Sequence, residues 1–321
     1  MPNPLLKITD LHTSFFTDAG EIKAVRGVSF GLDKGQTIGL VGESGCGKSV
    51  TALSIMRLVS FPGRIVKGEV FYNDKDLLKC SEDDMRKIRG AEIAMVFQEP
   101  MTSLNPVLTI GNQISEAISL HQNLNKREVI DKTAEMLKLV GIPSPEKRIK
   151  DYPHQMSGGM RQRAMIAMAL SCNPSLLIAD EPTTALDVTI QAQILELIQG
   201  LQKQFDMAMI LITHDLGVVA ETVDNVAVMY AGKIVEYTDT KTLFAEPLHP
   251  YTIGLLDSLP TIERTDGVLK TIPGTVPGLI NLPPGCSFYG RCPKGDSGCT
   301  EHEPELLEVK KGHWAACYKA Q

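Results

Sequence analysis

The segment GESGCGKS, residues 42–49, has the composition and spacing of a phosphate-binding loop. Its glycines allow backbone N–H groups to close around the β- and γ-phosphates of a nucleotide. Lys48 adds a mobile positive charge, and the hydroxyl of Ser49 is a candidate ligand for Mg²⁺. The residues expected to contact the nucleotide are Gly42, Ser44, Gly45, Cys46, Gly47, Lys48, Ser49 and Val50.

A second group of polar residues ends the apolar run SLLIAD, residues 175–180. This run is typical of a buried strand, and ligands bind at the carboxyl ends of strands in open α/β sheets. Asp180 is a candidate to hold Mg²⁺ through water, and Glu181 is placed to polarise an attacking water molecule. A solvated acidic pair at a strand end is common by itself, so this assignment depends on the loop upstream.

The stretch MSGGMRQR, residues 156–163, indicates a helix start whose backbone N–H groups are exposed. Such a helix start attracts anions because its first N–H groups lack partners and the helix dipole is positive there. Ser157, Gly158 and Gly159 therefore form a second candidate anion site, far in sequence from the first.

The elements that carry these motifs alternate between strands and helices. Residues 5–16 and 22–32 show strand-like alternation and predict an antiparallel β layer. Short buried strands are predicted at residues 37–42, 175–180 and 207–214. This order predicts an α/β domain with a largely parallel sheet.

Helical periodicity appears between the strands, at residues 107–140 and 190–201. The first stretch predicts an inserted helical subdomain, at about residues 100–165, with a glycine C-cap at Gly141. One apolar face is predicted for each stretch: Ile130, Ala134, Leu137 and Val140 for the first, and Ile190, Ile194, Leu197, Ile198 and Leu201 for the second.

The overall composition excludes several classes of protein. A formal net charge of −6 argues against a general binder of nucleic acid or anionic membranes. No run of about 18 apolar residues predicts a membrane span. The N-terminal sequence lacks the form of a secretory signal, so we expect a cytoplasmic location.

The last part of the chain differs in composition. From about residue 245 it is rich in proline and glycine, and it carries Cys286, Cys292, Cys299 and Cys317 with the spacing C-x5-C-x6-C-x17-C. Thiols in a reducing compartment stay free, bind zinc, or hold an iron–sulfur cluster. Zinc sites favour close cysteine pairs, which are missing from this spacing, so the pattern favours a [4Fe–4S] cluster. His302 and His313 keep Zn²⁺ open as the alternative.

Taken together, these motifs resemble the nucleotide-binding subunits of ABC transporters over about residues 5–240. The signature of that family is Leu-Ser-Gly-Gly-Gln, where this chain has Met156-Ser157-Gly158-Gly159-Met160, so both end positions depart. The resemblance implies an ABC-type P-loop NTPase fold that binds ATP and Mg²⁺. It also implies ATPase activity.

The same resemblance assigns further residues. Gln98 matches the glutamine that touches Mg²⁺ and water, and Asp187, in TALD, matches the D-loop at the dimer interface. His214 matches the switch histidine at the γ-phosphate, and Phe15, with Phe16 as the alternative, is the candidate aromatic stacked on adenine. In this family two domains pack head to tail, so the Ser157–Gly159 segment of one chain meets ATP held by another chain's loop.

The C-terminal segments EPLHPYT and CSFYGRCP resemble the dipeptide/oligopeptide branch of ABC importers, with nickel importers close by. Residues 241–321 are then an irregular, cysteine-rich extension that follows a nucleotide-binding domain at 1–240. The resemblance implies as partners a second ATP-binding subunit, two permease subunits and an extracytoplasmic peptide-binding protein. It places the chain as a peripheral protein at the cytoplasmic face of the cell membrane.

Three alternatives remain open at this point. The cargo of the importer is either a peptide or nickel. A soluble ABC-type ATPase of iron–sulfur assembly would use the same nucleotide motifs without a permease. The cysteine-rich end could instead act as a redox sensor that gates the ATPase.

Overall fold

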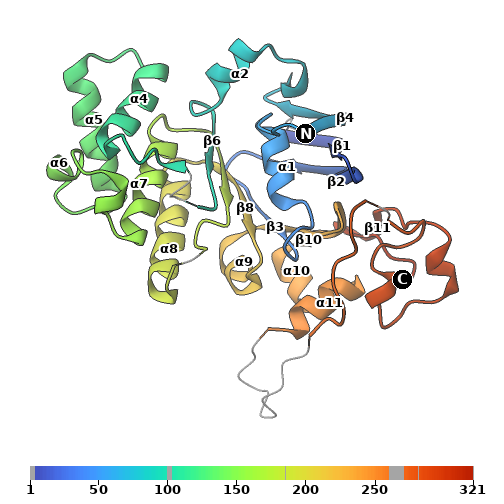
Figure 1. The fold of residues 1–321 in the computed structure, drawn as a ribbon. Coiled ribbons are helices and arrows are strands. Elements are labelled where there is room, and N and C mark those ends of the chain that lie inside the picture. Colours follow the sequence, from blue (N-terminus) through green and yellow to red (C-terminus); the bar gives the residue numbers. More distant parts are fainter. Residues whose placement is uncertain (1–3, 100–102, 185, 260–270, 281, 321) are drawn as a thin grey trace. The chain divides into compact units, whose positions relative to one another are not determined.

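The computed structural model describes residues 4–99, 103–184, 186–259, 271–280 and 282–320. The chain divides into two compact units (Figure 1). Unit 1 comprises Met1–Asp33, Thr37–Leu78 and Ile212–Gln321, and unit 2 comprises Lys34–Gln36 and Lys79–Leu211. Each unit is therefore assembled from segments that are distant in sequence.

The first sheet of unit 1 is antiparallel throughout, with the order β2-β1-β4-β5. Its strands are β1 (Leu6–Thr17), β2 (Gly20–Leu32), β4 (Gly63–Tyr72) and β5 (Lys75–Asp76). At the start of β1 the apolar Leu6 and Ile8 are buried whereas Lys7 and Thr9 are exposed, because successive residues of a strand lie on opposite faces. The antiparallel layer predicted from residues 5–16 and 22–32 is confirmed.

The other strands of unit 1 follow the order β11-β12-β10-β9-β3. They are β3 (Thr37–Val41), β9 (Asn225–Tyr230), β10 (Lys233–Asp239), β11 (Leu307–Lys310) and β12 (His313–Ala315). Strands β3 and β9 run parallel, whereas the remaining neighbours are antiparallel. The helices of unit 1 are α1 (Lys48–Ile55), α9 (Leu216–Thr222), α10 (Thr240–Ala245) and α11 (Pro250–Asp257).

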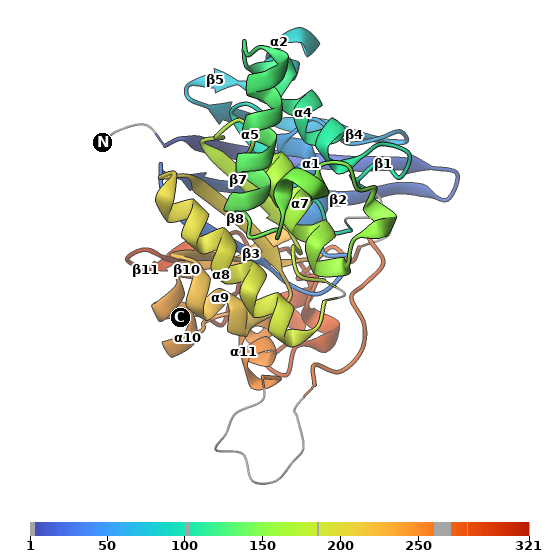
Figure 2. The same cartoon turned by 90° about the vertical axis from the view of Figure 1, so that its left-hand side faces the viewer.

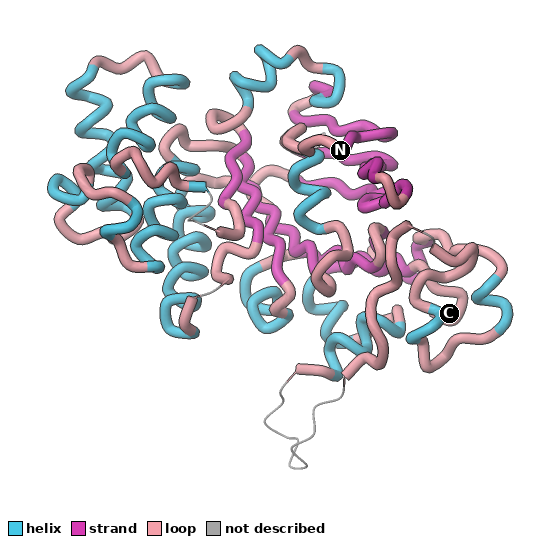
Figure 3. The backbone as a smooth tube through the Cα atoms, in the orientation of Figure 1, coloured by secondary structure: helices cyan, strands magenta, loops and turns pink. Residues whose placement is uncertain are grey.

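The C-terminal segment is mostly loop with the one-turn helices η3 (Tyr289–Arg291) and η4 (Ser297–Thr300), as Figure 3 shows. It nevertheless ends in the hairpin β11–β12, whose second strand pairs with β10. The turn of the hairpin contains Gly312 at a φ of 74°, a conformation that glycine adopts without strain. The tail therefore extends a sheet of unit 1.

A buried carboxylate fastens this segment to β10. Glu236, which is fully buried, accepts hydrogen bonds from the backbone N–H groups of Leu248 (2.7 Å) and His249 (2.9 Å), and its Oε1 lies 2.7 Å from Nε2 of His313. Such contacts satisfy the hydrogen-bonding capacity of a buried carboxyl group. His249 in turn caps α11, where its Nδ1 accepts from the N–H of Tyr251. Burial lowers the pKa of His249 to about 3, so the capping imidazole is neutral.

Unit 2 contains a short sheet, in which β6 and β7 run parallel, and a group of helices (Figure 2). The strands are β6 (Ile93–Val96), β7 (Leu176–Asp180) and the start of β8 (Ala208–Thr213), which continues into unit 1. The helices are α2 (Glu82–Ile88), α4 (Ile110–His121), α5 (Lys126–Leu139), α6 (Pro145–Arg148), α7 (Gly158–Leu170) and α8 (Val188–Gln204), with one-turn helices η1 (Leu77–Lys79) at the boundary and η2 (Pro153–Gln155). Helices α4, α5 and α7 pack against one another.

The helical periodicity of residues 107–140 corresponds to two helices, α4 and α5. The break is fixed by Asn125, whose side chain caps α5 and forms a reciprocal capping box with Glu128. The predicted face was wrong at one position, because Ile130 is 54% exposed whereas Val129 is buried. Spacings of three and four residues fit either face, and only packing against the neighbouring helices distinguishes them.

The face predicted for residues 190–201 is confirmed in α8 at Ile194, Ile198 and Leu201, which are buried, whereas Ile190 and Leu197 are half-buried. Gly141 follows α5 at a φ of 75°, as the C-cap prediction requires.

Candidate nucleotide site

The phosphate-binding loop lies between β3 and α1 and has a tightly specified backbone. Gly42 and Gly47 have φ values of 148° and 106°, which side chains rarely permit. A Cβ atom at Gly42 would lie 2.2 Å from the carbonyl oxygen of Met229, and one at Gly47 would lie 2.3 Å from that of Ala24. Neither position can hold another residue without a shift of the backbone.

Lys48 is the first residue of α1 and lies across the loop. Its Nζ donates to the carbonyl oxygens of Gly42 (2.8 Å) and Glu43 (3.1 Å) and lies 3.9 Å from Sγ of Cys46. The side chain is buried, as is Cys46, whose thiol pKa is raised by burial. Ser44 and Gly45 are exposed at the tip of the loop, whereas Ser49 and Val50 are half-buried at the start of α1.

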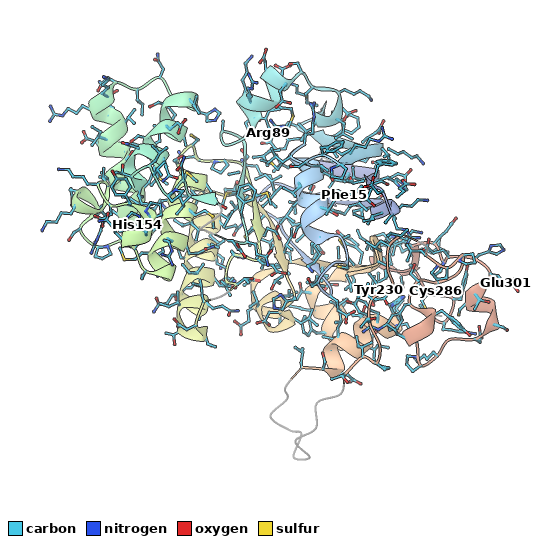
Figure 4. All side chains as sticks on the ribbon, viewed as in Figure 1. Phe15, Arg89, His154, Tyr230, Cys286 and Glu301 are labelled. Atoms are coloured by element: carbon cyan, nitrogen blue, oxygen red, sulfur yellow. The ribbon has the colours of Figure 1, made fainter. Side chains whose placement is uncertain are left out.

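Two aromatic residues of β1 stand at the predicted adenine position, of which Phe15 is labelled in Figure 4. Phe15 pairs with Gly63 of β4, and its ring covers that glycine. Phe16 is 39% exposed and lies under the guanidinium of Arg64, 4.1 Å from its ring centroid. Phe15 is therefore the half-buried member of the pair.

The acidic pair of unit 2 lies where β7 ends. Asp180 is buried as the last residue of the strand, and Glu181 follows in a left-handed conformation with a φ of 43°. Non-glycine residues in this region are strained and cluster at functional sites. Oε2 of Glu181 accepts hydrogen bonds from Nε2 of Gln98 (2.9 Å) and from Oγ1 of Thr184 (3.0 Å).

The fold of unit 2 thus brings together two of the predicted residues, Gln98 and Glu181, although they are 83 positions apart in the chain. Thr184 was not predicted. Its position three residues after Glu181, in the turn that precedes Asp187, is the signal that could have identified it. By holding one carboxylate oxygen, these donors fix the direction in which Glu181 points.

The MSGGM stretch forms the N-terminus of α7, as predicted. Ser157 is the N-cap and accepts from the N–H of Met160 at 3.4 Å. Met156 is buried and its carbonyl accepts from Arg161, which anchors the entry to the helix. Ser157 is exposed, and the first N–H groups of a helix have no partner within it, so this end is suited to an anion.

Asp187 and His214 occupy different units. Asp187, in unit 2, is the N-cap of α8, where its Oδ1 accepts from the N–H of Ile190. His214 is exposed at the end of β8 in unit 1, one residue before Asp215, the N-cap of α9. Unit 1 therefore carries the loop 42–49, Phe15 and His214. Unit 2 carries Gln98, Ser157–Gly159, Asp180, Glu181 and Asp187.

The four late cysteines line one small pocket of unit 1. Burial raises the pKa of Cys286 to about 11, an effect to which the thiols of Cys317, Cys292 and Cys299 add. Burial also raises the pKa of Cys292 and of Cys317. All seven cysteines of the chain are free.

These side chains do not form a site for a single metal ion. Within the described part of the chain, no three His, Cys, Asp or Glu side chains form a group that could hold a metal ion. His313, kept as a ligand for Zn²⁺, instead pairs with Glu236. The backbone of His302 accepts a hydrogen bond from Tyr318.

The described helices include none with the length and apolar character that a membrane span requires.

Comparison with known proteins identifies two regions. Residues 25–184 match the family described as ABC transporter, and residues 235–299 match the oligopeptide/dipeptide transporter C-terminal region. The oligopeptide transport ATP-binding protein AppD of Bacillus subtilis (strain 168) is 55% identical over 98% of this chain and 96% of its own length. The dipeptide transport ATP-binding protein DppD of the same organism is 52% identical, over 98% and 94% respectively.

Among solved structures, a dimeric ATP-binding cassette in a post-hydrolysis state, bound to ADP and Pi, superimposes with a TM-score of 0.66. It is 25% identical to this chain, and the match covers 73% of this chain and 98% of the cassette. The fold of the chain is accordingly that of an ABC ATPase cassette with mixed α/β sheets.

Proposed function

The chain belongs to the family of ABC transporter ATP-binding proteins and is an ATPase, and we propose that it powers the import of dipeptides or oligopeptides. The observation that carries the proposed cargo is the match of residues 235–299 to the oligopeptide/dipeptide transporter C-terminal region. The names of AppD and DppD support a peptide over nickel, and they favour transport over iron–sulfur assembly.

We assign the phosphate chemistry to the residues that the sequence motifs predict. The loop 42–49 cradles the β- and γ-phosphates, and Lys48 exchanges its carbonyl partners for phosphate oxygens. Ser49, Gln98 and Asp180 are the residues that would hold Mg²⁺, an ion that neutralises charge on the transferred phosphoryl group. Oxygen donors of this kind suit Mg²⁺.

Hydrolysis needs a water molecule oriented for in-line attack on the γ-phosphate. We assign this task to Glu181, whose carboxylate is held by Gln98 and Thr184, and to His214 as the contact to the γ-phosphate. A positioned general base contributes about 10²–10⁴-fold to a rate. Phe15 is the proposed stacking partner of adenine.

Ser157, Gly158 and Gly159 act on nucleotide held by another chain in this proposal, with Asp187 at the same interface. The anion-binding end of α7 supports this role, as does the dimeric state of the solved ADP-bound cassette. The partner is a second ATP-binding subunit, and ATP joins the two until hydrolysis removes the bridging γ-phosphate.

The remaining partners follow from the proposed transport. They are two permease subunits and an extracytoplasmic peptide-binding protein, so the chain is peripheral at the cytoplasmic face of the cell membrane. Residues 1–240 are the proposed nucleotide-binding domain, with its helical insert at about 100–165. Residues 241–321 are the proposed extension.

Uptake by membrane vesicles that contain the assembled transporter tests the cargo. With ATP inside and the binding protein outside, we expect a labelled dipeptide or oligopeptide to accumulate only when ATP is hydrolysable. Accumulation of Ni²⁺ without peptide would show that nickel, rather than a peptide, is the cargo. Purification of the chain without membrane proteins, together with labile iron, would support the iron–sulfur assembly alternative instead.

A second proposal concerns the pocket lined by Cys286, Cys292, Cys299 and Cys317. A single zinc ion draws every thiolate to about 2.3 Å from one point, and the described side chains do not converge in this way. A [4Fe–4S] cubane binds its four thiolates at separate corners. We therefore propose the cluster over Zn²⁺ for this pocket, with a structural role in holding the extension.

Analysis of anaerobically purified protein tests the cluster. We expect about four iron atoms and four acid-labile sulfides per chain, with visible absorption that Cys299→Ser abolishes. Cys172→Ser, outside the pocket, is the control and should leave the spectrum unchanged. Zinc without sulfide would establish the alternative, and neither metal would establish four free thiols.

A further inference from the structure

The C-terminal segment contacts the phosphate-binding loop through an ion pair. Arg291, at the end of η3, donates from its two terminal nitrogens to both carboxylate oxygens of Glu43, at 2.6 and 3.0 Å. The Arg291 side chain is 7% exposed and that of Glu43 is 32% exposed. Two-pronged pairs of this kind are stronger and more directional than a single contact.

A second contact acts on the main chain of the same residue. The N–H of Glu43 donates to the hydroxyl of Tyr251, at 2.8 Å. Burial raises the pKa of Tyr251, so this hydroxyl stays protonated. Glu43 is therefore held at its backbone and at its side chain by residues that lie more than 200 positions further along the chain.

The ion pair of Arg291 and Glu43 lies beside aromatic side chains, one of which, Tyr230, is labelled in Figure 4. The guanidinium of Arg291 lies 5.9 Å from the ring of Tyr230 and 6.0 Å from that of Phe288. Its Nε donates to the carbonyl of Pro273 at 2.9 Å. The hydrogen bond to Glu43 raises the pKa of Arg291 above its ordinary value. The arginine is thus fixed before any ligand arrives.

Glu43 places a carboxylate in the loop that is proposed to receive a triphosphate. Its carbonyl, with that of Gly42, holds Nζ of Lys48, so a movement of Glu43 would displace the lysine. Its carboxylate adds a negative charge beside the phosphates, and like charges repel at short range unless a cation compensates them. Arg291 supplies that cation.

We propose that the C-terminal extension, residues 241–321, fixes the phosphate-binding loop at Glu43 through Arg291 and Tyr251, and that Arg291 neutralises the carboxylate of Glu43. Arg291 is then a positioning residue for ATP. This inference rests on the proposed binding of ATP by residues 42–49. It connects the cysteine-lined pocket to the nucleotide, because Cys292 directly follows Arg291 and Cys286 lies five residues before it.

Titration of the full-length chain with a fluorescent ATP analogue tests the proposal. Arg291→Gln should weaken binding by about 10-fold, because a charged hydrogen-bond donor is lost and Glu43 is left uncompensated. Adding Glu43→Gln to this variant should restore most of the lost affinity, since it removes the repulsive charge. A purely structural role for Arg291 would give no such rescue.

Arg26→Gln provides the matched control. Arg26 of β2 also holds the C-terminal segment, with two hydrogen bonds to Glu303 at 2.9 and 2.7 Å, and its other side-chain hydrogen bonds go to Ala231 and Ser287 rather than to Glu43. We expect Arg26→Gln to lower the unfolding temperature as Arg291→Gln does, with ATP affinity unchanged.

Equal loss of affinity in the two variants would overturn the proposal, as would normal affinity in Arg291→Gln. Failure of the unaltered chain to bind the analogue would instead refute the proposed nucleotide site. The two failures are therefore distinguishable.

Discussion

Replacement of Glu181 by Gln is expected to lower ATP turnover by at least about 100-fold while ATP binding stays within a few-fold of normal. The amide has the size of the carboxylate and can keep the contact with Thr184 Oγ1, but it cannot take a proton from water. The loss therefore falls on the chemical step. Because the γ-phosphate persists, the variant should also accumulate a closed pair of ATP-binding subunits.

Steady-state ATPase rates of the assembled transporter, measured beside nucleotide titrations, separate these two effects. Glu196→Gln makes the same chemical change on an exposed face of α8 and should leave both quantities unaltered. Ordinary turnover in Glu181→Gln would remove Glu181 from its proposed role. Loss of ATP binding in this variant would instead show that Glu181 is needed to bind ATP.

The parts of the site that the sequence predicts are those whose chemistry is local. The loop 42–49 needs glycine where φ is positive and a lysine at a fixed offset, so its pattern is visible in eight residues. Ser157 and Asp187 precede helices and cap them, which is again a short-range property. In each of these segments the residue type itself carries the structural requirement.

Other features depend on packing between distant segments and could not be predicted from local sequence patterns. Val129 and Ile130 are both apolar, and only the neighbouring helices decide that Val129 is buried. The ion pair of Arg291 and Glu43 spans 248 positions, and neither residue belongs to a periodic pattern. The hairpin formed by β11 and β12 is short and partly charged, so its pairing with β10 has a weak sequence signal.

Replacement of Lys48 by Ala should weaken ATP binding by about 10- to 100-fold. A hydrogen bond from a charged donor contributes about 1.5–3 kcal/mol, and each 1.4 kcal/mol corresponds to a factor of ten in affinity. Lys48 is buried against the carbonyls of Gly42 and Glu43, so its ammonium group is already at the loop and needs little reorganisation to reach a phosphate. A competing titration with ATP measures the loss.

Because alanine also removes two hydrogen bonds from the loop, a stability effect must be separated from the loss of charge. Lys48→Met keeps the length of the side chain and should show the same loss of affinity, with a smaller change in unfolding temperature. Lys67→Ala, at an exposed site of β4, is the control and should bind ATP normally. Should Lys48→Met retain full affinity, the charge at this position would have no part in holding phosphate, and the nucleotide would have to bind elsewhere.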